Sequence, residues 1–286
     1  DRAVRAIGKA VYDDAKRLAD MAVEETGIGN AAHKIVKNQA KPKATWWRLK
    51  GVKSRGILRH LDEGIVEIAH PMGVLGCITP TTNPTMTPVH NAMIALKGGN
   101  AVIVGPHPRS KNTTMETVKV MREALREVEA PEDLIQCVDT ATVEVSQQLM
   151  ARCDATISTG GPGMVRAAYS AGKPAFGVGP GNVNVLIADD AKDLDAIAEK
   201  IVRGRVYDNG VLCTCEQSVI VPASMLDEFV NALKEQGAHY TDDPDDAARI
   251  GAAVFSDGVM AKEMVGRGYS RCGPAFGRSR CRHAVR

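Results

Sequence analysis

Residues 73–105 read GVLGCITPTTNPTMTPVHNAMIALKGGNAVIVG, which is two apolar runs separated by a helical pattern. The first run predicts a strand over Gly73–Thr79, and the second predicts another over Ala101–Gly105, after the turn at residues 98–100. Between them, Thr87–Lys97 has the apolar spacing that is expected of a helix. A helix that joins two short strands is typical of a βαβ unit, in which the strands run parallel.

The same alternation of strands and helices continues toward the C-terminus. The predicted elements are Asn112–Val128 (helix), Leu134–Val138 (strand), Val143–Arg152 (helix), Ala155–Ser158 (strand), Met164–Ala171 (helix) and Val183–Ile187 (strand). Short strands that alternate with helices indicate a parallel sheet covered on both faces. Because crossover connections are right-handed, we expect an α/β fold with a doubly wound, Rossmann-like sheet.

The composition is that of a soluble globular protein, with 44% hydrophobic and 24% charged residues and a net charge of +2. A charge so near neutrality does not indicate binding to nucleic acid or to a membrane surface. No apolar run reaches the roughly 18 residues that a membrane span needs. The seven cysteines are odd in number and scattered, so we expect no disulfide framework, and a cytoplasmic protein.

One cysteine lies in a predicted loop, where a substrate could reach its thiol. Residues 207–218 read YDNGVLCTCEQS, and Cys213 lies between an Asn-Gly turn and the apolar strand expected at Val219–Val221. A thiol in a loop that enters a strand can meet a substrate, although a buried, inert thiol is the commoner case. Cys215 has no histidine or second cysteine pair at zinc-site spacing, so we interpret it as structural and predict no metal site.

A proline-bounded loop and two glycine-rich turns accompany this cysteine. In the loop TPTTNPT of residues 79–85, prolines on both sides of Asn83 stiffen the backbone. The turn TGGPG of residues 159–163 lies between a predicted strand and a predicted helix, where N–H groups favour phosphate. The spacing of its glycines is not G-x-G-x-x-G, so this turn taken alone would predict only a tight turn. Asn83 taken alone would likewise predict only a residue that caps a turn. The second turn, GVGPGN, covers residues 177–182.

Together these motifs resemble those of the aldehyde dehydrogenase superfamily, and specifically of its CoA-acylating branch. The resemblance runs from about Asp1 to about Val265, with the motifs in the family's order. It implies that Cys213 is the nucleophile and that the Asn83 amide donates a hydrogen bond to the developing oxyanion. It also implies that a dinucleotide, NAD or NADP, contacts Pro80, Thr81, Thr82, Asn83, Pro84, Thr85, Gly160, Gly161 and Gly179.

The resemblance implies a reversible oxidation of an aldehyde with NAD(P)+ and CoA to acyl-CoA and NAD(P)H, through a thiohemiacetal and a thioester on Cys213. Hydrolytic relatives carry a water-activating glutamate in a segment that matches residues 177–182, where this sequence has glycine. Without that base, attack by water should be slow, and CoA is the expected acceptor. Two alternatives remain open. They are a hydrolytic dehydrogenase that uses another carboxylate, such as Glu216, and a catalytically inactive fragment.

The expected organisation has four parts. Residues 1–69 are predicted as an N-terminal helical segment of the cofactor domain, 70–188 as the dinucleotide-binding domain, and 189–265 as part of a catalytic domain that carries the thiol. Residues 266–286 are rich in arginine and lack Asp, Glu and Lys, which indicates an unpacked basic tail. Family members continue further, so the chain looks truncated. The expected partners are a small-molecule aldehyde or acyl-CoA and, in the full-length protein, copies of itself, with no nucleic acid or membrane.

Overall fold

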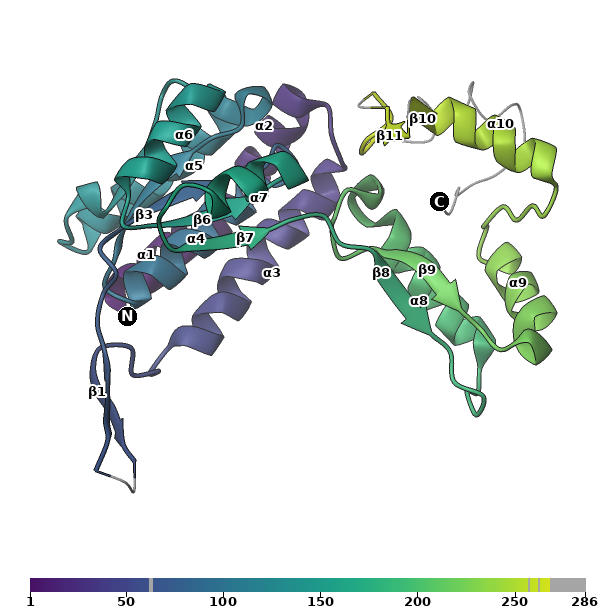
Figure 1. The fold of residues 1–286 in the computed structure, drawn as a ribbon, viewed down its shortest axis with the longest axis horizontal. Coiled ribbons are helices and arrows are strands. Elements are labelled where there is room, and N and C mark those ends of the chain that lie inside the picture. The colour runs from purple at the N-terminus through teal and green to yellow at the C-terminus, as the bar shows by residue number, and fades with distance from the viewer. Residues whose placement is uncertain (62–63, 257, 262, 268–286) are drawn as a thin grey trace. The chain divides into compact units, whose positions relative to one another are not determined.

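The computed structural model describes residues 1–61, 64–256, 258–261 and 263–267 (Figure 1). The chain divides into two compact units. The first unit comprises Asp1–Thr26 and Lys34–Pro180, and the second comprises Gly27–His33 and the chain from Gly181 on. The division thus precedes the boundary that we expected near residue 188.

A five-stranded parallel sheet forms the centre of the first unit. Its strand order is β5-β4-β3-β6-β7, with β3 at Val74–Ile78, β4 at Ala101–Gly105, β5 at Ile135–Cys137, β6 at Ala155–Thr159 and β7 at Ala175–Val178. All neighbouring strands in it are parallel. Strands β3 to β6 are those that the alternation predicted, with nearly the same ends.

Helices cover both faces of this sheet (Figure 1). One face carries α1 (Arg2–Asp13), α4 (Met86–Lys97) and α5 (Lys111–Glu127), and the other carries α6 (Val143–Arg152) and α7 (Pro162–Tyr169). Successive strand side chains point to opposite faces. Leu75 and Cys77 therefore join the core of the first face, whereas Ile78 packs with Leu149 and Ala168 on the second. The prediction of a doubly wound α/β sheet is confirmed.

The N-terminal residues are only partly helical. After α1 come α2 (Ala15–Thr26) and α3 (Ala31–Leu49), as the periodicity predicted. Residues 56–69 instead form an antiparallel ribbon of β1 (Gly56–His60) and β2 (Val66–Ala69). The prediction of a helical segment over residues 1–69 is wrong for this part, because β-branched residues that oppose one another, such as Ile57 and Ile68, favour paired strands.

Strand β7 is not among the predicted elements. Residues 177–182 were expected to form a glycine-rich turn, but Gly177 and Val178 lie in β7. A Cβ on Gly177 would come within 2.7 Å of Tyr169 and Val165, both on α7. This glycine therefore allows close contact between helix and strand, which single-sequence patterns do not distinguish from a turn.

The second unit is built on a two-stranded parallel sheet. Its elements are β8 (Val183–Leu186), α8 (Leu194–Val206), β9 (Glu216–Ile220), α9 (Leu226–Glu235), α10 (Pro244–Val254), β10 (Phe255–Ser256) and β11 (Val259–Met260). Because β8 pairs with β9, the strand predicted over Val183–Ile187 exists but does not belong to the five-stranded sheet. Helices α8 and α9 pack against the β8–β9 sheet around Ile201 and Phe229.

Short 3₁₀ helices complete the described residues, at Pro108–Ser110, Glu132–Leu134, Tyr207–Gly210 and Ala223–Met225. No helix in the part of the chain that the structure describes is long and apolar enough to cross a membrane. Most of the tail predicted over residues 266–286 lies outside the described residues.

Candidate active site

The predicted dinucleotide loops gather at one edge of the five-stranded sheet. Chain order runs from β3 outward through β4 and β5, and then returns to β6 on the other side of β3. Ile78 at the end of β3 lies beside Ser158 near the end of β6, so the loops that follow both strands leave the same edge. In open parallel sheets, ligands bind outside the carboxyl ends of the strands where the order reverses in this way.

The loop after β3 is fixed at both ends. Thr79 donates its backbone N–H and its hydroxyl to the Gly105 carbonyl oxygen, at 3.0 and 3.2 Å. At the other end, the Asn83 carbonyl accepts the Thr87 N–H at 3.2 Å, which leads the chain into α4. Pro84 and Thr85 are buried, whereas Asn83 is partly exposed. The chain thus turns inward after Asn83, which itself stays partly accessible.

The loop after β6 presents the N-terminus of α7. Gly160 donates its N–H to the Val178 carbonyl at 3.1 Å, and Gly161 is the N-cap residue with Pro162 next to it. Gly161 has a φ of −68°, which any residue can adopt, and a Cβ there would meet nothing within 4 Å. The same holds for a Cβ on Gly163. Neither backbone strain nor packing within the chain requires glycine at these two positions, and the space above them is open.

The turn before Cys213 has an unusual backbone. Asp208, Asn209 and Gly210 have φ values of 52°, 56° and 68°, three successive residues in the left-handed region. Glycine adopts this region freely, and Asp and Asn tolerate it better than other residues. The Asp-Asn-Gly sequence is therefore suited to reversing the chain between α8 and the cysteine loop.

Residues 27–33 of the second unit hold this turn in place. The Asp208 N–H donates to Nδ1 of His33 at 2.9 Å, and the Asp208 carboxylate accepts the Asn30 N–H at 2.8 Å. The Tyr207 hydroxyl donates to the His33 carbonyl at 2.9 Å, and the two rings stack with centroids 4.5 Å apart. Asn209 donates its side-chain amide to the Gly29 carbonyl at 3.0 Å. The cysteine loop thus follows a turn that is fixed by side-chain and backbone hydrogen bonds.

The two cysteines of the loop differ in exposure. Cys213 is exposed, whereas Cys215 is buried and its thiol contacts the Tyr207 carbonyl at 3.8 Å. Burial raises the pKa of the Cys215 thiol above its ordinary value. Of the two, Cys213 has the thiol that a dissolved substrate can reach. No group of three or more His, Cys, Asp or Glu residues that could hold a metal occurs among the described residues.

Comparison with known proteins identifies the family. The model of the aldehyde dehydrogenase family matches residues 1–261 of this chain. The chain belongs to the aldehyde dehydrogenase family. The resemblance that we inferred from the three motifs is confirmed.

Relatives within this family are similar over almost the whole chain. The succinate-semialdehyde dehydrogenase (acetylating) of Clostridium kluyveri is 42% identical over 268 residues, which are 93% of this chain and 59% of the relative. The crystal structure of an acetylating aldehyde dehydrogenase from Geobacillus thermoglucosidasius has a TM-score of 0.92 and 36% identity, over 100% of this chain and 63% of that one. A propionaldehyde dehydrogenase from Rhodopseudomonas palustris with bound propionyl-CoA has a TM-score of 0.84 and 32% identity, over 97% of this chain and 62% of that one. This chain thus spans about three-fifths of the length of the relatives it matches.

Sequence analysis missed two sets of residues in this aldehyde dehydrogenase chain. One is the segment 27–33, which holds the turn before Cys213. The other is a pair of buried lysines on α3, Lys34 and Lys37, which donate hydrogen bonds to the loop after β3. The only signal that could have found the lysines is their spacing of three, which places both on one side of a helix.

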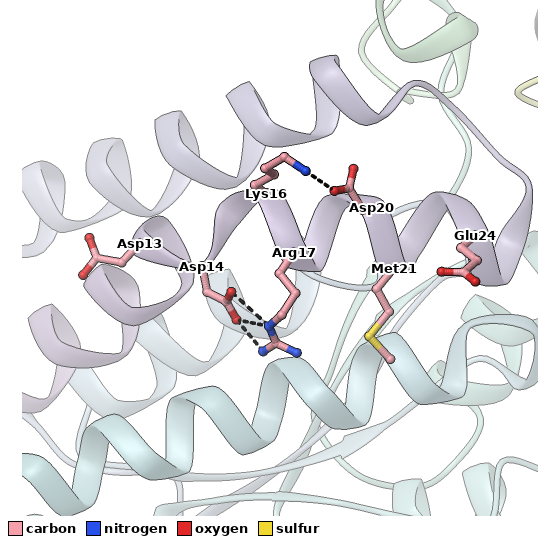
Figure 2. Close-up of a pocket in the computed structure, with 7 residues that line it drawn as sticks. All are labelled: Asp13, Asp14, Lys16, Arg17, Asp20, Met21 and Glu24. Carbon is pink, nitrogen blue, oxygen red and sulfur yellow. Dashed lines mark hydrogen bonds and ion pairs between the residues drawn. The ribbon is translucent and has the colours of Figure 1, made fainter.

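A surface hollow of about 490 Å³ lies elsewhere on the first unit, along α2 (Figure 2). It is lined by Asp13, Asp14, Lys16, Arg17, Asp20, Met21 and Glu24. Lys16 pairs with Asp20 at 2.6 Å, and Arg17 bonds to Asp14. The hollow contains none of the predicted residues, and these two contacts are solvated ion pairs of the kind common on helix surfaces.

Proposed function

We propose that this protein oxidises an aldehyde with NAD(P)+ and CoA, giving acyl-CoA and NAD(P)H, and that the reaction is reversible. The observation that carries the proposal is the convergence of the loop 79–85, Gly160, Gly161 and the residues after β7 at the edge where the sheet order reverses. Such an edge is the usual binding place of dinucleotides in doubly wound sheets.

The residues at this edge fit a dinucleotide. The open space above Gly161 and Gly163 allows a phosphate to approach the N-terminus of α7, where backbone N–H groups and the helix dipole favour negative charge. Among the residues that the structure describes, no group hydrogen-bonds to the buried hydroxyls of Thr156 and Ser158 on β6. We assign Pro80–Thr85, Gly160, Gly161 and Gly179 to dinucleotide binding. When bound, the dinucleotide supplies the hydride acceptor.

Cys213 is the proposed nucleophile. Its thiolate attacks the aldehyde carbon and forms a C–S bond, while the carbonyl electron pair moves onto oxygen. The Asn83 amide donates a hydrogen bond to that oxyanion, an interaction that contributes about 3 kcal/mol in comparable enzymes. Loss of hydride from the same carbon restores the C=O bond and leaves a thioester on Cys213. The CoA thiolate then attacks the thioester, the acyl–sulfur bond to Cys213 breaks, and the cysteine thiolate is regenerated.

The choice of CoA over water as acceptor rests on a missing carboxylate. Residues 177–182 contain no Asp or Glu that could activate water. The rival base, Glu216, lies at the start of β9, and its carboxylate packs on Gly204 of α8, where a Cβ would come within 2.2 Å of it. The Glu216 carboxylate thus lies against α8. The acetylating names of similar proteins agree with CoA as the acceptor.

The test follows reduced nicotinamide formed by the purified chain from a panel of aldehydes, with NAD or NADP, and with or without CoA. We expect turnover only when CoA is present, and acyl-CoA as the product by mass spectrometry. Free acid without CoA would instead support the hydrolytic alternative, and Glu216→Gln then tests the rival base. A folded chain that forms neither product would contradict the proposed activity.

A further inference from the structure

Two buried lysines lie against the loop that carries Asn83, and the reaction as described gives them no role. Lys34 and Lys37 on α3 are 4% and 7% exposed. Lysines are rarely so buried, because removing an ammonium group from water is costly unless polar partners compensate. Nζ of Lys37 donates to Oδ1 of Asn83 at 2.6 Å, and Nζ of Lys34 makes a longer contact, at 3.4 Å, with the Thr82 carbonyl. Both ammonium groups are thus directed at the proposed oxyanion loop.

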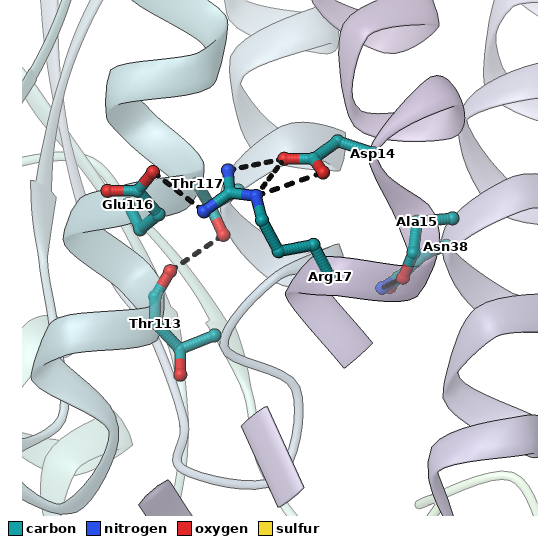
Figure 3. Close-up of polar contacts among 7 residues, drawn as sticks. All are labelled: Asp14, Ala15, Arg17, Asn38, Thr113, Glu116 and Thr117. Carbon is teal, nitrogen blue, oxygen red and sulfur yellow. Dashed lines mark hydrogen bonds and ion pairs between the residues drawn. The ribbon is translucent and has the colours of Figure 1, made fainter. Parts of the chain in front are cut away.

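The backbone that carries Lys37 is itself anchored. The next residue, Asn38, is 2% exposed and donates its side-chain amide to the Ala15 carbonyl on α2 at 3.2 Å. Figure 3 draws Asn38 and Ala15 together with Arg17, which bonds to Asp14 on one side and to Glu116 of α5 on the other. Helix α3 is therefore bonded to the start of α2 by a buried side chain, and this contact helps to place Lys37 beside Asn83.

Hydrogen-bond chemistry decides which end of the Asn83 carboxamide faces Lys37. An ammonium group has only donors, so it can bond only to the amide oxygen. The amide nitrogen is thereby turned away from Lys37, and its contact with the Thr82 hydroxyl, at 3.4 Å, is long. The N–H end of Asn83 keeps its capacity to donate, and the bond from a cation to the oxygen polarises the amide so that its N–H groups become stronger donors.

We propose that Lys37 is the positioning residue for Asn83: it locks the carboxamide with its N–H end toward the reacting carbonyl, and its charge strengthens that donation. The inference rests on the proposed role of Asn83 as oxyanion donor. Lys37 does not itself touch the substrate in this scheme. It acts through Asn83, and the positive charge it holds beside the loop also favours the negative charge that develops in the transition state.

The experiment is a double-mutant cycle on the full chain. Lys37→Met keeps an unbranched apolar side chain that is one atom shorter, and removes the charge and the hydrogen-bond donors. Lys37→Arg keeps the charge and the donors. Lys41→Met changes an exposed lysine on the same helix and is the matched control. We measure kcat, the Kd of the dinucleotide and the thermal midpoint for each variant. We expect Lys37→Met to lower kcat by about 10- to 100-fold, with dinucleotide Kd and thermal midpoint close to wild type. Lys37→Arg should recover part of the loss, and Lys41→Met should change nothing.

Asn83→Ala separates this inference from the function it rests on. Because Lys37 acts through Asn83, the Lys37→Met/Asn83→Ala double variant should be no slower than Asn83→Ala alone. Unchanged kcat in Lys37→Met, or a double variant that shows the full product of the two losses, would overturn the role of Lys37. An inactive wild-type chain, or a fully active Asn83→Ala, would instead overturn the proposed function. If Lys37→Met fails to fold, Lys37→Gln replaces it in the same cycle.

Discussion

The two parallel sheets of this protein differ in how they are covered. Strand β3 is buried over most of its length, with Leu75 facing one helical layer and Ile78 the other. In strand β8, partly buried positions alternate with exposed ones. Leu186 on β8 is 75% exposed, and Ile220 on the neighbouring strand β9 is 56% exposed. A sheet with helices on both faces buries continuous apolar strands, whereas a sheet with helices on one face leaves every second side chain outside.

The contrast matches the division of labour that we propose. Binding a dinucleotide needs a rigid edge, which the doubly covered sheet supplies. The nucleophile needs access to substrate, and Cys213 is exposed in the loop that follows the turn bonded to His33. In this proposal the first unit binds the dinucleotide and supplies Asn83, and the second unit supplies the nucleophile.

The largest effect should come from Cys213→Ala. We expect at least about a 10³-fold loss of turnover, because no other group replaces the nucleophile, while the dinucleotide Kd stays at the wild-type value. Steady-state kinetics and a fluorescence titration of reduced nicotinamide measure the two quantities. Cys215→Ala is the matched control and should keep most activity. Loss of dinucleotide binding in Cys213→Ala would break the proposed division between the units.

The hydrophobic cores of the two units should respond separately when a buried side chain is shortened to alanine. Met93→Ala in the first unit should lower the free energy of unfolding of that unit by about 2–5 kcal/mol, because it opens a cavity in a fully buried core. Phe229→Ala should do the same for the second unit, and Ile220→Ala, at an exposed site, should cost less than about 0.5 kcal/mol. Hydrogen exchange resolved by peptide measures each unit. Equal loss of protection in both units after either core change would mean that they unfold as one.

Alanine substitutions at two glycines of the first unit should distinguish a loss of dinucleotide binding from a loss of packing. Gly161→Ala should weaken dinucleotide binding by about tenfold and change stability by less than about 1 kcal/mol, because its Cβ meets only open space. Gly177→Ala should cost about 1–3 kcal/mol, since its Cβ would collide with Tyr169 and Val165. Calorimetric titration and thermal unfolding measure the pair. The assignment of Gly161 fails if both variants bind the dinucleotide like wild type.

The smallest effect should come from the ion pairs at the surface of the first unit. Arg17 bonds to Asp14 and Glu116 but its side chain is 51% exposed. Arg17→Met should therefore cost about 1 kcal/mol or less, and less still in high salt. Denaturant unfolding at two ionic strengths tests this. A cost as large as that of Met93→Ala would show that the polar contacts between α2 and α5, and not the apolar core, dominate the stability of this unit.

The sequence predicted the positions of the strands better than it predicted which strands pair with one another. Four strands of the five-stranded sheet were predicted with nearly correct ends, because apolar runs between turn residues mark buried parallel strands. The fifth strand was misassigned: β7 was taken for a turn, and β8 was placed in a sheet to which it does not belong. Periodicity reports that a segment is extended, but not which strand it pairs with, and a glycine in a strand resembles a glycine in a turn.

The residues of the candidate site likewise differ in whether the sequence alone could identify them. Cys213, Asn83 and the glycine turns could be found from sequence because each combines an unusual residue with a turn signal. Lys37 could not, because a lysine on an amphipathic helix is ordinarily a solvated residue. Only the packing of α3 against its neighbours turns that lysine inward toward the loop.

The sequence by itself thus determined the α/β alternation, the family and the residue types available for chemistry, since these depend on spacing along the chain. The tertiary structure alone decided that β8 pairs with β9, that Cys213 is exposed while Cys215 is buried, and that Lys37 bonds to Asn83. The reason is physical. Strand partners, burial and the direction of a long side chain are set by contacts between residues far apart in sequence, which no local pattern encodes.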